Sequence, residues 1–189
     1  MRLGVFGGTF DPPHLGHLIV ASDIYAELEL DRLVFVPAAA PPHKRGRVHA
    51  SAERRLEMVR AAVAADPRFT VDDLELQREG ESYSVDTLRE FRAREPDAEL
   101  FFIIGVDQLR EIDSWRQPEE VARLATLVVV SREGDEADLD MAFPVRAVSV
   151  TRIDLSATRI RERVERREPI RYLVPDEVRE IIEREKLYD

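Results

Sequence analysis

The feature that most constrains this chain is a turn of glycine, proline and histidine directly after an apolar run near its start. Residues 3–6 predict a short buried strand, and residues 7–17 then read GGTFDPPHLGH. Adjacent glycines at Gly7 and Gly8 allow backbone geometries that a Cβ atom disfavours, so the chain can turn sharply there. Apolar residues at helical spacing predict a helix over residues 15–30.

Two histidines lie three positions apart where this helix begins. Residues with that spacing share a helix face, so the imidazoles of His14 and His17 can point at one object. Gly16 places no side chain between them, which lets that object approach the backbone. Because a helix N-terminus presents unpaired N–H groups and partial positive charge, we expect an anion such as a phosphate there.

Two other interpretations of this turn stay open. A strand, a glycine turn and a helix also occur in ordinary α/β architecture without any ligand. Histidines three apart can chelate zinc, but the chain has no cysteine, and no nearby carboxylate–histidine cluster supplies further ligands. We therefore favour the anion site and expect no metal held by the protein, although Asp11 is conceivable as an outer-shell partner.

Length and composition indicate one globular domain over residues 1–189. The chain is 44% hydrophobic, which is enough for a substantial core. Zero cysteine agrees with a reducing cytoplasm, and the apolar run at residues 100–104 is too short to span a bilayer. We expect a cytoplasmic protein with no membrane partner, and a homo-oligomer is compatible with the sequence.

The charge balance limits the partners of the chain. The formal net charge is -10, so the overall field repels nucleic-acid backbones and argues against a sequence-independent nucleic-acid binder. Small anionic substrates remain compatible with this charge where positive groups gather locally. Lys44 and Lys186 are the only lysines, and the other basic side chains besides histidine are arginines.

Strand and helix signals alternate along the chain. Apolar runs predict strands over residues 3–6, 33–36, 100–104, 127–130 and 145–150, and an extended segment over 69–76. Periodicity predicts helices over residues 15–30, 51–65 (capped by Ser51), 84–94, 118–125, 156–166 and 176–186, and the acidic residues 132–142 indicate a mobile loop. The alternation predicts a Rossmann-like α/β fold, with an open, mostly parallel sheet, helices on both faces and a small helical C-terminal part over residues 151–189.

The expected sheet places the candidate residues at one edge. Ligands of such sheets bind beyond the carboxyl ends of the strands, where Gly7, Gly8, Pro37 and Gly105 fall. The Gly-x-Gly-x-x-Gly fingerprint and the Gly-x-x-x-x-Gly-Lys-[Ser/Thr] loop are both missing from the first turn. Hydride transfer and phosphate-loop chemistry therefore lose their best support.

A basic loop follows the second strand on the same side. Residues 41–44 read Pro-Pro-His-Lys, and an isolated His-Lys pair of this kind often contacts only solvent. Here two prolines stiffen the loop where it leaves the ligand side of the sheet, so Lys44 is a candidate phosphate clamp.

Later segments add polar groups whose structural and functional interpretations differ. Ser156 is a helix N-cap candidate, and Thr158 and Arg161 lie three apart on one face of that helix. Asp107 suits either a helix N-cap or an acceptor for a ribose hydroxyl. A lone tryptophan is more often a core residue, yet Trp115 lies among polar neighbours that leave one ring face available.

Residues 7–18 resemble the signature of the nucleotidylyltransferase superfamily, a His-x-Gly-His box that follows a strand. The longer string through Phe10-Asp11-Pro12 and His17-Leu18 is similar to bacterial nicotinate-nucleotide adenylyltransferases. The matching motifs are Pro41-Pro42-His43-Lys44, Ser82-Tyr83-Ser84, Asp113-Ser114-Trp115 and the Ser-Ala-Thr-x-x-Arg string at 156–161. Matches continue to residues 172–176, so the resemblance covers nearly the whole chain.

The resemblance implies roles for individual residues. It implies catalytic roles for His14, His17, Lys44 and Arg161. It implies substrate contacts for Gly7, Gly8, Thr9, Phe10, Tyr83, Ser84, Gly105, Asp107, Trp115, Arg116, Ser156 and Thr158. In the family the tryptophan stacks on the pyridine ring, backbone N–H groups near it receive the nicotinate carboxylate, and the Ser-Ala-Thr-x-x-Arg string holds the β- and γ-phosphates. Two positions depart from the family, since Ser84 replaces a usual threonine and Arg116 a frequent tyrosine.

The implied reaction is adenylyl transfer from ATP to nicotinate mononucleotide in NAD biosynthesis. It gives nicotinate adenine dinucleotide and pyrophosphate by direct in-line displacement, with Mg²⁺ carried by ATP. Alternatives are nicotinamide mononucleotide or another phosphorylated acceptor, such as phosphopantetheine, in the same ATP site. A nucleotide-binding regulator without turnover and a flavodoxin-like electron carrier are rivals from other functional classes.

Overall fold

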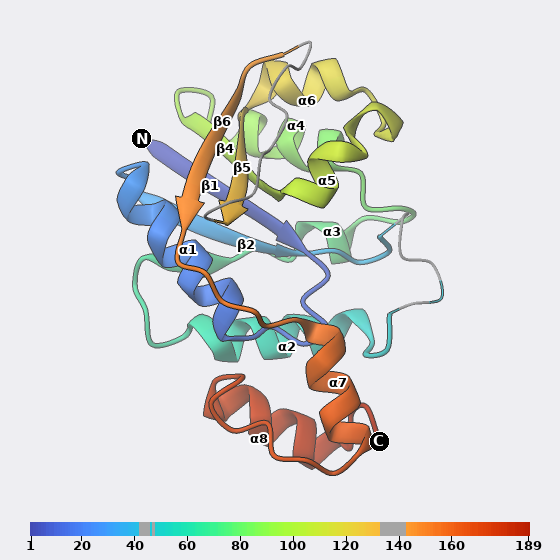
Figure 1. Ribbon diagram of the computed structural model, residues 1–189. Coiled ribbons are helices and arrows are strands. Elements are labelled where there is room, and N and C mark those ends of the chain that lie inside the picture. The colour runs from blue at the N-terminus through green and yellow to red at the C-terminus, as the bar shows by residue number, and fades with distance from the viewer. Residues whose placement is uncertain (42–45, 47, 133–142) are drawn as a thin grey trace.

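A six-stranded sheet forms the centre of the molecule. The computed structural model describes residues 1–41, 46, 48–132 and 143–189. The strands are β1 (Arg2–Gly8), β2 (Arg32–Pro37), β3 (Phe69–Val71), β4 (Glu99–Gly105), β5 (Thr126–Arg132) and β6 (Val145–Val150). Their order is β3-β2-β1-β4-β5-β6, and every pairing is parallel (Figure 1). The expected open, mostly parallel sheet is confirmed, and it is parallel throughout the described residues.

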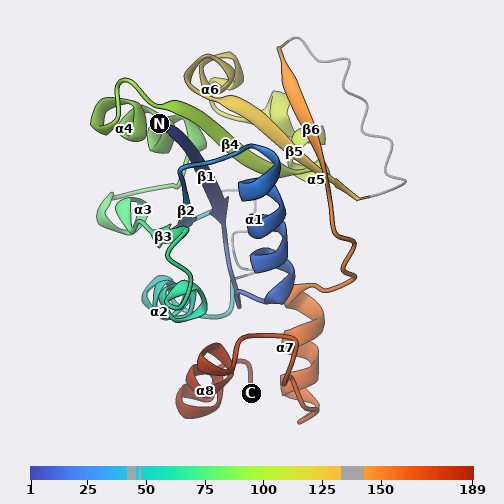
Figure 2. The same cartoon turned by 90° about the vertical axis from the view of Figure 1, so that its left-hand side faces the viewer.

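Helices connect the strands and cover both faces of the sheet, as expected. They are α1 (Leu15–Glu27), α2 (Ala52–Val63), α3 (Leu74–Gln77), α4 (Ser84–Arg94), α5 (Val106–Arg110), the 3₁₀ helix η2 (Ile112–Ser114), α6 (Pro118–Leu124), α7 (Ala157–Glu165) and α8 (Asp176–Glu185). Figure 2 shows α1 and α4 on opposite sides of β1. None of the helices in the described part of the chain is both long and apolar enough to cross a membrane.

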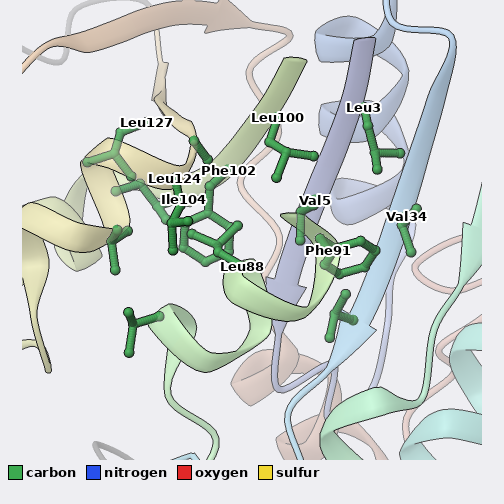
Figure 3. Close-up of a cluster of buried hydrophobic side chains, with 14 of the residues drawn as sticks. Leu3, Val5, Val34, Leu88, Phe91, Leu100, Phe102, Ile104, Leu124 and Leu127 are labelled. Atoms are coloured by element: carbon green, nitrogen blue, oxygen red, sulfur yellow. The ribbon is translucent and has the colours of Figure 1, made fainter. Parts of the chain in front are cut away.

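The central strands are buried on both faces because alternate side chains enter two different cores. Leu100, Phe102 and Ile104 of β4 pack with α4, α5 and α6 in one cluster (Figure 3). Phe101 and Ile103 of the same strand enter the other cluster, which contains residues of α1 and α2. A strand covered on both sides has no polar face, which explains the continuous apolar run in its sequence.

The last two helices build a smaller third core with α2. Ile160 of α7 and Val178, Ile181 and Ile182 of α8 pack with Met58 of α2. Figure 1 shows α7 and α8 beyond α2, away from the sheet. Since α2 also gives Val59 to the sheet-facing core, this helix joins the C-terminal helices to the sheet.

The structure differs from the sequence expectations around β3 and β4. The expected extended segment over 69–76 holds only three strand residues. Helix α3 begins at Leu74, and the N–H of Leu74 donates a hydrogen bond to the Asp72 side chain at 2.9 Å. The short helices α5 and η2 follow β4, where the apolar periodicity predicted no helix and only the N-cap interpretation of Asp107 implied one. Helix α1 ends at Glu27 rather than at residue 30. Residues 133–142 of the expected acidic loop lie outside the described residues.

Candidate active site

Loops from neighbouring strands leave the sheet side by side at its carboxyl edge. Gly8 at the end of β1 is in register with Pro37 at the end of β2, and the Ala38 N–H donates to the Gly8 carbonyl at 2.9 Å. Gly105 ends β4 at the same edge, because β1 and β4 are parallel neighbours. The predicted convergence of these glycines and Pro37 is therefore confirmed.

The two histidines stack on each other at the start of α1. His14 is the N-cap residue, and its N–H donates to Nδ1 of His17 at 3.1 Å. Their rings are nearly parallel, with centroids 3.7 Å apart. The expectation that both imidazoles share one helix face is confirmed. The ring of His17 also meets the edge of the Phe10 ring, at a centroid distance of 5.0 Å.

The environment of the His14 imidazole keeps this ring uncharged. His14 is buried, and burial lowers the pKa of its imidazole to about 4, so the ring is neutral near pH 7. Its Nδ1 atom has no hydrogen-bond partner among the residues that the structure describes. A neutral imidazole can donate one hydrogen bond but brings no formal charge to a phosphate. Positive charge for a phosphate at this turn must therefore come from groups other than His14.

The glycines and Phe10 of the turn have packing roles that the sequence interpretation did not include. A Cβ atom on Gly8 would lie 2.7 to 2.9 Å from the ring of Phe10, which is itself buried and has a φ of 49°. A Cβ atom on Gly16 would lie 3.0 Å from Nδ1 of His14. The space above Gly16 thus holds the His14 ring, rather than being left for a ligand.

Asp11 is a structural anchor in the same turn. Its buried carboxylate accepts hydrogen bonds from the N–H groups of His49 and Ala50, at 2.8 and 3.1 Å, and from the hydroxyl of Tyr188 at 2.8 Å. These donors engage both oxygens, so the geometry does not support Asp11 as an outer-shell metal partner. The described residues include no group of three or more metal-ligating side chains.

Helix α7 reaches this turn from the other end of the chain. Ser156 caps the helix by accepting from the Arg159 N–H at 3.3 Å, as expected. The Arg161 guanidinium donates to the main-chain carbonyl of Asp11 at 2.8 Å and to Oγ1 of Thr158 at 3.2 Å. The shared face of Thr158 and Arg161 is confirmed. Arg159 points elsewhere and pairs with Asp154 at 3.4 Å.

Arg55 is a buried residue of the site region that the sequence interpretation missed. It lies on α2 and donates to four main-chain carbonyls, those of Thr9, Ala38, Ala39 and Ala50, at 2.8, 2.6, 3.1 and 3.2 Å. It thereby joins the loop after β1 to the loop after β2. The available sequence signal was its position: Arg55 lies four residues before Val59 and eight before Val63, on the apolar face of α2.

The loop after β2 is also bound to the segment before α4. Oγ of Ser82 accepts from the N–H groups of Ala39 and Ala40, at 3.0 and 3.2 Å. Tyr83 follows as the N-cap residue of α4, its hydroxyl donates to Glu81, and the half-buried Ser84 begins the helix. Pro41 is described, whereas Pro42, His43 and Lys44 lie outside the described residues.

Trp115 and Arg116 meet this segment from the loop after η2. Trp115 is half-buried and packs edge-on against Phe102, with ring centroids 6.2 Å apart, so one of its edges belongs to the core. The Arg116 guanidinium lies 4.9 Å from the centre of the Tyr83 ring and 3.4 Å from Asp86. The structure therefore brings residues 83–84 and 115–116 together.

Asp107 lies in the first turn of α5, but it is not the N-cap residue. The cap is Gly105, whose N–H donates to Oε1 of Gln108 at 3.0 Å. The Asp107 side chain is 95% exposed and pairs with Arg110 at 3.1 Å. The N-cap interpretation of Asp107 is therefore wrong, and its carboxylate is accessible at the sheet edge.

Comparison with known proteins places the whole chain among nucleotidyltransferases. Residues 5–163 match the cytidylyltransferase-like family model. A protein of Thermus thermophilus named probable nicotinate-nucleotide adenylyltransferase is 50% identical over 188 residues, and the match covers 100% of this chain and 100% of that protein. A protein of the same name from Geobacillus thermodenitrificans is 44% identical over 99% of this chain and 86% of its own length.

Solved structures of low sequence identity share the fold. The Plasmodium falciparum nicotinic acid mononucleotide adenylyltransferase complexed with NaAD has a TM-score of 0.82 and 18% identity, over 100% of this chain and 97% of its own. The same enzyme complexed with APC has a TM-score of 0.79 and 16% identity, with the same coverage. These structures confirm the Rossmann-like α/β architecture.

Proposed function

This chain belongs to the nicotinate-nucleotide adenylyltransferases of the cytidylyltransferase-like family, and we propose that it transfers the adenylyl group of ATP to nicotinate mononucleotide. The products are nicotinate adenine dinucleotide (deamido-NAD) and pyrophosphate. The observation that carries the proposal is the pair of stacked imidazoles at the N-terminus of α1, with Arg161 bound to the same turn. That arrangement suits a phosphate in transfer.

The reaction needs no nucleophile from the protein. A 5′-phosphate oxygen of the mononucleotide attacks the α-phosphorus of ATP, the bond from that phosphorus to the pyrophosphate oxygen breaks, and no redox change occurs. Catalysis is then positioning and charge stabilisation. We propose that His14 and His17 donate hydrogen bonds to the oxygens of the α-phosphate, with His17 closer to them because the His14 ring is buried beneath it.

Positive charge for the triphosphate comes from the later helix and the basic loop. We propose that Arg161, Thr158 and the N-terminus of α7 capped by Ser156 hold the β- and γ-phosphates. Lys44 is the second proposed clamp. Mg²⁺ would enter as part of the substrate MgATP, with phosphates and water as its main ligands.

The remaining predicted residues form the proposed nucleotide and acceptor contacts. Gly7, Gly8, Thr9 and Phe10 offer main-chain groups, since the Phe10 ring is buried in the core. Gly105 and the exposed Asp107 carboxylate suit a ribose hydroxyl. Tyr83, Ser84, Trp115 and Arg116 are proposed for the nicotinate moiety, with main-chain N–H groups for its carboxylate. The Arg116 guanidinium lies over the Tyr83 ring and adds positive charge beside the proposed nicotinate contacts.

An acceptor panel tests this function directly. Purified protein is mixed with MgATP and nicotinate mononucleotide, nicotinamide mononucleotide or phosphopantetheine, and pyrophosphate release is measured. We expect the highest kcat/KM with nicotinate mononucleotide. A higher value for either other acceptor would reassign the substrate, and nucleotide binding without pyrophosphate release would favour a regulator. Visible flavin absorbance in the purified protein would favour the electron carrier.

Direct displacement has its own test. Incubation with ATP labelled in the α-phosphate, without acceptor, is expected to leave the protein unlabelled after denaturation. A covalent adenylyl-protein would contradict in-line transfer between the two substrates.

A further inference from the structure

The hydroxyl of Tyr188 donates to Oδ1 of Asp11 at 2.8 Å, which joins the segment after α8 to the first turn of the site. The two residues are 177 positions apart in the sequence. Asp11 lies between the sheet and His14, in the loop where the stacked imidazoles begin. No other side chain donates to this carboxylate in the described residues, since its further donors are main-chain N–H groups.

The backbone after α8 is shaped to deliver this hydroxyl. Lys186 and Tyr188 have φ values of 51° and 70°, and the Leu187 N–H donates back to the Ile182 carbonyl at 3.0 Å. A positive φ is uncommon for a bulky side chain and persists where surrounding contacts hold it. The Tyr188 ring packs against the third core, formed by α2, α7 and α8, so its direction is fixed by packing as well as by the hydrogen bond.

The Asp11 end of this contact is connected to the groups proposed for catalysis. The main-chain carbonyl of Asp11 accepts from Arg161, the proposed phosphate clamp. The Asp11 carboxylate holds the N–H of Ala50, and the Ala50 carbonyl accepts from Arg55, which also holds Thr9. A shift of Asp11 would therefore reach Arg161 on one side and the turn at Thr9 on the other.

We infer that Tyr188 is a positioning residue for adenylyl transfer: its hydroxyl fixes Asp11 and thereby the loop that carries His14 and His17. The inference rests on the proposed function of the site. Tyr188 is not among the groups proposed to contact the reacting atoms. Burial and the adjacent Asp11 raise the pKa of the Tyr188 hydroxyl, so it remains a protonated donor throughout the working pH range.

Tyr188→Phe removes only the hydroxyl, and Tyr172→Phe is the matched control. Tyr172 lies between α7 and α8 and is 78% exposed, and its hydroxyl makes no hydrogen bond with the residues that the structure describes. We expect Tyr188→Phe to lower kcat about tenfold, since small displacements of positioned groups cost large factors in rate. The KM for nicotinate mononucleotide should change less than about twofold, because its proposed contacts lie on other loops.

These measurements separate positioning from a role in stability alone. Assays are run well below the melting temperature of each variant, where a residue that only stabilises the fold would leave kcat of the folded protein unchanged. Unaltered kcat in Tyr188→Phe, with active wild-type protein, would overturn the inference. An equal loss of kcat in Tyr172→Phe would overturn it as well. Inactive wild-type protein would instead refute the proposed function.

A readout without catalysis tests the contact itself. Amide hydrogen exchange of ligand-free protein should be severalfold faster at His49, at Ala50 and at the non-proline residues of 9–17 in Tyr188→Phe than in wild type or Tyr172→Phe. Unchanged exchange there would show that the hydroxyl does not hold the loop and would refute the inference, whatever the wild-type activity.

A double-mutant cycle identifies the route of the effect. If the hydroxyl acts through Asp11, adding Tyr188→Phe to Asp11→Ala should change kcat by less than about twofold. The same tenfold loss in both backgrounds would show that the hydroxyl acts elsewhere, which would contradict the assigned route.

Discussion

Gly16 leaves the space that the imidazole of His14 occupies: a Cβ atom on Gly16 would lie 3.0 Å from Nδ1 and 3.1 Å from Cε1 of that ring. Gly16→Ala should therefore displace His14 from its stack on His17. We expect kcat to fall at least about tenfold. The unfolding free energy should change by less than about 1 kcal/mol, because the helix preference of alanine offsets the local crowding. Steady-state kinetics beside urea unfolding would check both, and an unchanged kcat would show that the stack is not needed.

His17→Ala removes the imidazole that we place closest to the transferring phosphate. We expect kcat to fall by ~10² or more, by analogy with the loss of one preorganised oxyanion donor. The protein should still fold, although the His14 N–H loses its acceptor at a cost of about 1 kcal/mol. His49→Ala is the control, since its side chain is exposed and its N–H to Asp11 is retained. Near-wild-type turnover of His17→Ala would remove the proposed role.

The burial of His14 predicts a pH dependence of stability. The pKa of its imidazole is about 4, against an ordinary value of 6.5. Between these values the unfolded chain binds a proton that the folded protein does not, so stability falls as the pH decreases from 6.5 to 4. At 1.36 kcal/mol per pKa unit, the full loss is about 3 kcal/mol.

His14→Asn should lack this contribution. The stability advantage of wild type over the variant should therefore shrink by about 3 kcal/mol between pH 7 and pH 4, as measured by urea unfolding. Comparing the two proteins cancels the titration of the many carboxylates that they share. A constant difference across this window would mean that His14 titrates alike in the folded and unfolded states.

Substitution of Arg55 tests how the loop after β1 is joined to the loop after β2. Arg55→Lys keeps the charge but loses the planar fork that reaches four carbonyls, so we expect the unfolding free energy to fall by about 3 kcal/mol. Arg54→Lys, one residue earlier on α2, changes an arginine whose side chain is 41% exposed and should cost less than about 1 kcal/mol. Equal effects of the two substitutions would contradict the special position of Arg55.

Arg161 and Arg159 form a matched pair for the phosphate proposal. Both lie on α7, but Arg161 is turned toward the Asp11 loop and Arg159 toward Asp154. We expect Arg161→Ala to lower kcat/KM for ATP by about 10–100-fold, the range for a lost hydrogen bond to a charged group. Arg159→Ala should stay within about twofold of wild type. Similar losses from both would indicate a general charge effect of the helix.

Local spacing was sufficient to predict the contacts that lie within one element. The three-residue spacing predicted that His14 and His17 share a face, and likewise Thr158 and Arg161, because helix geometry alone sets both relationships. The alternation of apolar runs and helices predicted the parallel sheet, because parallel neighbours need a crossover connection, which is usually a helix. The common edge of Gly8, Pro37 and Gly105 followed from strand direction.

Contacts between distant segments could not be predicted in this way. The hydrogen bond of Tyr188 to Asp11 and the four carbonyl contacts of Arg55 depend on how α2 and α8 pack, which no local period encodes. The helix at Leu74–Gln77 was missed because four residues are too short to show a helical period. The N-cap interpretation of Asp107 failed because Gly105, two residues earlier, is the N-cap residue of that helix, which begins at Val106.

The central position of β1 has a consequence for synthesis on the ribosome. β1 pairs with β2 on one edge and with β4 on the other, where Arg2 is in register with Glu99. During translation β1 and β2 leave the exit tunnel long before β4 is made. One edge of the nascent first strand therefore stays without its native partner until the fourth strand has emerged, and this interval is when a chaperone would protect the growing chain.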